Sequence, residues 1–143
     1  MTSAGWTAEG RPLLAGDAVG PALVLDAPLS FWGGVDATTG RIVDAHHPQH
    51  GASVAARILV LPSGRGSSSS SSVLAECLAA GTGPLAILLG EPDPILLVGA
   101  MVAAELGHAR CPMVVIGDAR LRIATGDTVR IVTSGRIGVA PSR

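Results

Sequence analysis

The sequence predicts one mixed α/β domain that is rich in β-strands. The chain has 143 residues, which is close to the usual size of a single domain, and 48% of them are hydrophobic. Short apolar runs separated by Gly and Pro turns fill the first half, and helix-like segments follow a serine run at residues 67–72. We therefore expect a single domain over residues 11–143, with residues 1–10 as a flexible N-terminal segment.

Three short strands are expected in the first half, at residues 22–25, 41–44 and 57–61. Each run is rich in Val, Ile or Leu, residues that favour extended structure. Turn signals separate them: Gly33-Gly34, then residues 38–40, then residues 48–51. This half of the chain should therefore contribute mainly to a sheet.

Helices and strands alternate in the second half. The expected elements are a helix at 73–80 ended by Gly81, a strand at 85–89, a helix at 95–106 ended by Gly107, a strand at 113–116, and a hairpin of 128–132 and 136–139 around Ser134-Gly135. The second helix is apolar on nearly every face, and Glu105 is its only charge. We expect this helix to be buried or to lie in an interface.

Composition excludes several classes of function. Ten basic and eleven acidic residues give a net charge of -1, so a nucleic-acid-binding surface is not expected. The longest uncharged apolar stretch, residues 94–104, is far shorter than the roughly 20 residues that cross a membrane. Residues 1–11 lack the features of a signal peptide, so we expect a cytoplasmic location and no membrane partner.

The two cysteines, Cys77 and Cys111, are too far apart for a Cys-x-x-Cys metal site, and the chain shows no export signal that would favour a disulfide framework. Any cysteine-bound cluster would therefore have to come from another chain.

The serine run has two interpretations. Six consecutive serines are typical of a flexible linker. However, the run joins an apolar strand ending at Pro62 to an apolar helix, which fits a strand-to-helix turn better. The helix start, with Arg65 beside it, can hold a carboxylate or a phosphate. The pattern is neither a P-loop nor the dinucleotide-binding fingerprint, because Ser69 stands where the third Gly of that fingerprint would be.

Three histidines, His46, His47 and His50, invite a metal-binding interpretation. Pro48 prevents the helix that would align them, and no Cys or acidic partner follows at ligand spacing. A polar surface loop is the favoured interpretation, and no metal site is expected.

The segment at residues 29–36 combines Phe31 and Trp32 with Gly33-Gly34. One interpretation is a core side chain followed by a tight bend. The other is a rigid aromatic edge that docks a partner subunit, because aromatic anchors beside small residues suit interfaces. The spacing of the residues is compatible with both.

Six blocks of sequence resemble, in order, the small subunit of the aconitase X family. They are PLSFWGGVD at residues 28–36, Thr39-Gly40, His47-Pro48 with Gly51, LVLP at 59–62, GRGSS at 64–68 and GAMVA at 99–103. The similarity extends over roughly residues 11–140, nearly the whole chain. It implies the swivelling β/β/α domain of the aconitase mobile domain, which closes over a substrate held by a large subunit.

The resemblance also implies roles for residues. Ser67 is the expected general base and Ser68 the nearest alternative, while Arg65, Gly66 and Ser68 would bind the substrate. The expected partner interface or site edge consists of Phe31, Trp32, Gly33, Gly34, Asp36 and His47. The large subunit of this heterodimer would carry an iron–sulfur cluster as Lewis acid. Ser70 departs from the family, which often has Gly there, and so leaves the turn geometry open.

Family members act on β-hydroxy acids: bacterial members on cis-3-hydroxy-L-proline and archaeal members on mevalonate 5-phosphate. All ten basic residues are Arg, which is typical of a GC-rich bacterial source and favours hydroxyproline. A rival hypothesis from another class is a non-catalytic binding module whose serine run is a linker. An independent serine enzyme ranks last, because no nucleophile elbow is present.

Overall fold

The structure is a computed structural model that describes residues 5–142. Its elements are β1 (Trp6–Glu9), β2 (Arg11–Leu14), β3 (Ala18–Val24), β4 (Val35–Asp36), β5 (Arg41–Ile42), β6 (Ile58–Leu61), α1 (Ser70–Ala80), β7 (Ala86–Leu89), α2 (Pro94–Glu105), β8 (Met113–Val115), a 3₁₀ helix (Gly117–Arg122), β9 (Thr128–Ile131) and β10 (Arg136–Ala140). The expected strands and helices are all present, with ends shifted by a few residues.

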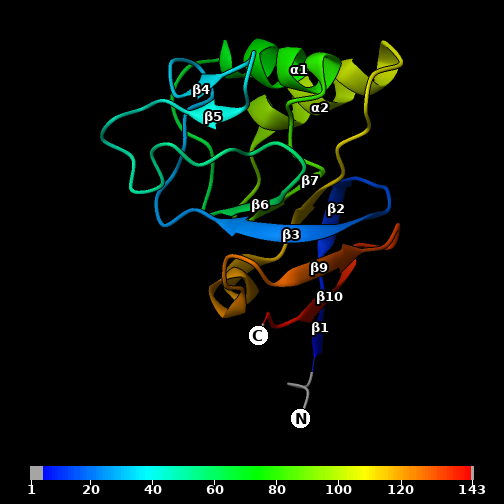
Figure 1. The fold of residues 1–143 in the computed structure, drawn as a ribbon. Helices are drawn as coiled ribbons and strands as arrows, with labels where there is room; N and C mark the ends of the chain where they lie inside the picture. The colour runs from blue at the N-terminus through cyan, green and yellow to red at the C-terminus, as the bar shows by residue number, and fades with distance from the viewer. Residues whose placement is uncertain (1–4, 143) are drawn as a thin grey trace.

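The elements form three layers (Figure 1). Strands β3, β6, β7 and β8 make a parallel central sheet, with β2 antiparallel at its edge. Helices α1 and α2 cover one face of this sheet, and β9, β10 and β1 cover the other. Strand β3 joins the two sheet layers, because its end pairs with β6 and its start pairs with β9.

Strand β6 shows why the central runs are apolar without alternation. Leu59 and Leu61 face the helices, whereas Ile58 and Val60 face the β9–β10 layer. All four side chains are essentially inaccessible to solvent. A parallel strand covered on both faces requires apolar residues at every position, and β7 follows the same rule.

Helix α2 is only partly covered. Its buried side consists of Leu96 and three small residues, Gly99, Ala100 and Ala103, and the helix packs against α1. Its opposite side exposes Val98 and Met101, each about half accessible. The helix is apolar on nearly every face, as its sequence indicated, but one of these faces is buried and another is exposed to solvent.

The N-terminal segment differs from the expectation of flexibility. Residues Trp6–Glu9 form β1, which pairs antiparallel with β10. Trp6 and Ala8 are the half-buried members of this strand and pack on the β9–β10 core. Residues 1–4 of the expected flexible segment lie outside the described residues. No helix within residues 5–142 has the length and apolar character needed to span a bilayer.

Candidate active-site cleft

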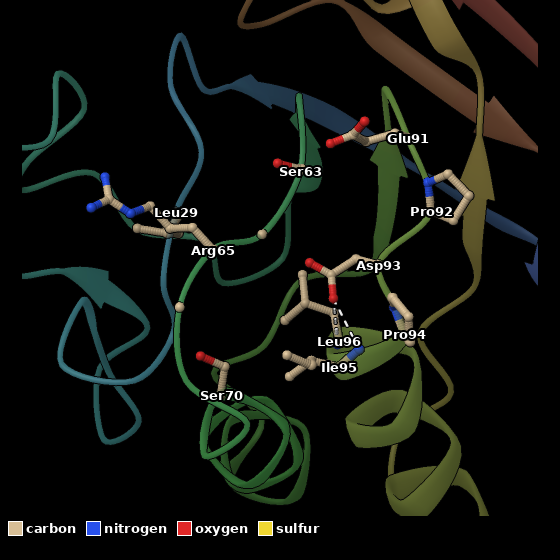
Figure 2. A pocket seen from close by; sticks show the side chains of 12 residues that line it. Leu29, Ser63, Arg65, Ser70, Glu91, Pro92, Asp93, Pro94, Ile95 and Leu96 are labelled. Carbon is tan, nitrogen blue, oxygen red and sulfur yellow. Dashed lines mark hydrogen bonds between the residues drawn. The ribbon is translucent and has the colours of Figure 1, made fainter.

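A cleft of about 260 Å³ opens at the carboxyl ends of β6 and β7, where α1 and α2 begin. Figure 2 shows the side chains around it. Its walls are Leu29, the turn after β6 (Ser63, Gly64, Arg65, Gly66, Ser70), and the β7–α2 connection (Glu91, Pro92, Asp93, Pro94, Ile95, Leu96). The carboxyl edge of a parallel sheet is the usual ligand-binding place in open α/β folds.

The serine run is an ordered turn that leads into α1. Gly64 pairs with Leu29 in a parallel bridge, and the Arg65 N–H donates to the Leu29 carbonyl at 3.2 Å. Gly66 has a φ of 85°, a conformation that favours glycine. The Ser70 N–H then donates to the carbonyl of Ser67 at 3.0 Å. These bonds support the strand-to-helix turn over the linker interpretation.

Ser67 lies within this turn and is half-buried. Its Oγ accepts the N–H of Ser69 at 3.0 Å, a bond that would strengthen if the oxygen carried negative charge. Ser69 caps α1 with its backbone alone and makes no side-chain cap bond. Arg65 and Gly66 line the cleft, whereas Ser67 and the exposed Ser68 stand next to its wall and are not part of it.

Ser70 lines the cleft, although the sequence marked it only as a departure from the family. It is 3% exposed, and its Oγ accepts the N–H of Trp32 at 3.0 Å. The Ser30 hydroxyl lies 3.4 Å from the same oxygen and donates to the Trp32 carbonyl at 3.0 Å. Ser70 thereby fixes the backbone of the aromatic–glycine segment against the turn.

The structure separates the two interpretations of that segment residue by residue. Phe31 is completely buried, so its side chain belongs to the core. Trp32 is 59% exposed beside it, and Gly33 is also exposed, whereas Gly34 is buried. Asp36 accepts the N–H of Thr38 at 2.9 Å and shapes the following turn. Trp32 is therefore the aromatic side chain available to a partner.

His47 is buried rather than part of a polar surface loop. Its Nδ1 accepts the N–H of Gln49 at 3.0 Å, and its Nε2 lies 3.2 Å from the carbonyl of Ala27. These partners require a neutral ring with the proton on Nε2. His47 thus ties its loop to the segment that leads into Leu29 at the cleft, and both ring nitrogens are occupied.

Asp93 is the site residue that the sequence analysis missed. It is 9% exposed, and its Oδ1 accepts the N–H groups of Ile95 and Leu96, each at 3.0 Å. An added Cβ at Gly64 would overlap the Oδ2 of Asp93, which explains the glycine at that position. The Asp-Pro pair before an apolar helix was a visible N-cap signal.

The charged groups of the cleft are not neutralised by ion pairs. Within residues 5–142, the one ion pair shorter than 4 Å joins Glu9 to Arg136. Arg65 and Glu91 are both exposed, and Figure 2 shows the Arg65 guanidinium extended away from the carboxylates of Glu91 and Asp93. The cleft therefore has a cationic side and an acidic side.

The described chain offers no ligand set for a metal or cluster. Among residues 5–142, no three His, Cys, Asp or Glu side chains are grouped to hold a metal ion. Cys77 and Cys111 are both buried, and burial raises the pKa of Cys111 to about 12. These residues do not fit an iron–sulfur cluster, which needs thiolate ligands.

Comparison with known proteins identifies close relatives. A cis-3-hydroxy-L-proline dehydratase of Pseudomonas aeruginosa is 47% identical over 108 residues, which cover 76% of this chain but 19% of the relative. The chain thus spans about a fifth of that protein's length. The phosphomevalonate dehydratase small subunit of Methanothermobacter thermautotrophicus is 42% identical over 93 residues, which cover 65% of this chain and 71% of the relative.

The fold comparison agrees. A crystal structure of aconitase X from Thermococcus kodakaraensis, in its holo-form, matches with a TM-score of 0.84 and 34% identity, covering 94% of this chain and 98% of that one. The expected β/β/α swivel fold is confirmed. The family model for the aconitase X swivel domain matches residues 7–139. This chain therefore belongs to the aconitase X swivel-domain family.

Proposed function

We propose that this chain is the swivel-domain part of an aconitase-X-type dehydratase that removes water from cis-3-hydroxy-L-proline. The observation that carries the proposal is the 47% identity to a protein with that named activity. The GRGSS turn at residues 64–68, which borders the cleft, supports the same assignment. The remaining catalytic parts would come from a large subunit.

We place the iron–sulfur cluster in that large subunit. Bound there, it would act as a Lewis acid on the departing hydroxyl. The role of this chain is to close over the substrate and supply the base.

Ser67 is the proposed base. Acting as an alkoxide, its Oγ would take the proton from the carbon next to the substrate carboxylate. The C–H electron pair then forms the double bond, and the hydroxyl on the neighbouring carbon leaves. The Ser69 N–H at 3.0 Å and the start of α1 supply the partial positive charge that an alkoxide needs. Arg65 would bind the carboxylate with the backbone of Gly66 and the hydroxyl of Ser68.

Trp32 is the proposed contact to the large subunit. Its exposed indole, and its backbone N–H that donates to the cleft residue Ser70, support a rigid docking point. Gly33, Gly34 and Asp36 would shape the same edge, while Phe31 and His47 would support it from within. Trp32→Ala should weaken subunit association by about tenfold or more, measured by calorimetry. Unchanged affinity would remove Trp32 from the interface.

Phosphomevalonate is the second candidate substrate, because a relative with that name, from Methanothermobacter thermautotrophicus, is 42% identical. The deciding experiment is anaerobic co-purification with an aconitase X large subunit, followed by dehydration assays with both compounds. Turnover of cis-3-hydroxy-L-proline is the expected result. If only mevalonate 5-phosphate is dehydrated, that compound is the substrate and the hydroxyproline assignment is wrong. A stable complex without either activity would favour the binding-module hypothesis.

A further inference from the structure

We propose that the α2 side of the cleft recognises a positively charged nitrogen on the substrate, with Asp93 as the main contact and Glu91 as a supporting one. The substrate class would then be a zwitterionic β-hydroxy amino acid. The inference rests on the proposed function for the location of the substrate. It adds residues that select for the amine.

The free oxygen of Asp93 is the first argument. Both hydrogen bonds of its carboxylate go to Oδ1. Within residues 5–142, every fully buried side-chain oxygen or nitrogen has a hydrogen-bond partner. Because Oδ2 has none, it is not fully buried, and since Asp93 lines the cleft, this oxygen is accessible from there. Figure 2 shows this oxygen turned away from α2, toward the turn that carries Arg65.

The burial of Asp93 strengthens the interaction that this oxygen can make with a cation. The residue is 9% exposed, so its carboxylate has lost most of its water. A partly desolvated carboxylate with one unused oxygen binds an ammonium group more strongly than a solvated one does. Its position is fixed by the two N–H groups of α2, so little side-chain entropy is lost on binding.

The start of α2 is unsuited to an anion. Asp93 already occupies the N–H groups of Ile95 and Leu96, and Pro94 has no N–H to donate. Glu91, which lines the same wall, adds a second negative charge. A phosphate placed here would meet two carboxylates and no free donor from the first turn. This wall therefore favours a cation and disfavours a phosphate ester.

The opposite wall has the complementary chemistry. Arg65 is exposed, forms no ion pair within residues 5–142, and lies in the turn that leads into α1. Its guanidinium would attract a carboxylate on that side. An α-amino acid with its ammonium group at Asp93 would turn its carboxylate toward the turn that carries Arg65.

Calorimetry on the complex with the large subunit tests the inference. The probes are L-proline and cyclopentanecarboxylate, which has the same ring size and carboxylate but no nitrogen. The wild-type complex should bind L-proline about tenfold or more tightly than cyclopentanecarboxylate. Asp93→Asn should lose that preference and leave binding of cyclopentanecarboxylate unchanged, and Glu91→Gln should lower L-proline affinity by a smaller factor.

Asp93→Asn keeps the fold testable, because Asn caps helices as well as Asp does. Asp17→Asn is the matched control: it removes the same charge at a residue outside the cleft whose Oδ1 accepts only the Thr133 hydroxyl. This control should retain the preference for L-proline. Equal binding of the two probes by the wild type, a preference that survives Asp93→Asn, or no binding of either probe would each overturn the inference. If the wild-type complex shows no dehydratase activity but prefers L-proline in a way that depends on Asp93, only the proposed function is contradicted.

Discussion

Helices α1 and α2 both begin at the cleft, but their first turns have opposite chemistry. Helix α2 starts with Asp93, whose carboxylate accepts two N–H groups, and with Pro94, which has no N–H. Helix α1 starts after Ser69, which makes no side-chain cap bond and has no acidic residue in its first turn. The first N–H groups of α2 are therefore held by a carboxylate, whereas those of α1 are held by backbone carbonyls of the serine turn.

This difference predicts that the two helix starts contribute unequally to stability. A capped helix start contributes about 1 kcal/mol to stability and cannot bind an anion. Helix α1 lacks a side-chain cap, and its first N–H groups donate instead to backbone carbonyls of the preceding serine turn, as Ser70 does to Ser67. The predictions below test whether the α1 turn supplies the base and whether the side-chain cap of α2 adds stability that α1 lacks.

The largest effect is expected at the α1 turn. Ser67→Ala should lower the dehydration rate of the complex by about a hundredfold or more, because it removes the proposed base. Steady-state kinetics on the purified complex would measure the loss. The matched control is Ser72→Ala, an exposed serine from the same run, which should keep full activity. Equal rates for the two variants would remove Ser67 from the mechanism.

The next effect concerns the contact between the turn and the aromatic segment. Ser70→Ala should lower the free energy of unfolding by about 1–3 kcal/mol, because the Trp32 N–H loses its acceptor in a part-buried position. Urea unfolding followed by Trp fluorescence would report it. A change below a few tenths of a kcal/mol would mean that water replaces the hydroxyl.

The two caps can be compared directly. Asp93→Ala should lower the free energy of unfolding by about 1 kcal/mol, since two N–H groups lose their acceptor. Ser69→Ala should change it very little, because the Ser69 side chain makes no cap bond. Equal losses in both variants would show that the two helix starts are not differently built.

Local patterns in the sequence predicted most of the fold. The apolar runs at 57–61 and 85–89 predicted β6 and β7, and Gly81 marked the end of α1. Strand β1 was missed because four residues with weak alternation, WTAE, do not exceed the background of loop sequences. Its partner β10 lies at the other end of the chain, so only tertiary pairing identifies it.

The candidate site was predicted in part for the same reason. The Gly-Arg-Gly-Ser turn is local, and it was found. Asp93 enters the site because β7 lies beside β6, and Ser70 matters because it contacts Trp32, which is 38 positions away. Contacts between distant segments leave no periodic signal in a single sequence, so these two roles required the structure.

The smallest effect concerns the two buried thiols, Cys77 on α1 and Cys111 just before β8. Burial raises the pKa of both, to about 12 for Cys111, and the Thr82 hydrogen bond partly offsets the rise at Cys77 on α1. A raised pKa means that the unfolded chain releases the thiol proton at a lower pH than the folded chain does. Stability should therefore decline as pH rises through about 9, and for Cys111 the decline continues toward about 12.

By pH 9 the loss should be roughly 0.4 kcal/mol for Cys111. Urea unfolding at pH 7 and pH 9 would measure it, with Cys111→Ala as the comparison. That variant is less stable at both pH values because it leaves a cavity, but its decline between them should be smaller than that of the wild type. An equal decline would assign the alkaline loss to other groups. A smaller decline in Cys111→Ala than in Cys77→Ala would show that the core behind α2 excludes the thiolate more strongly than the face of α1 does.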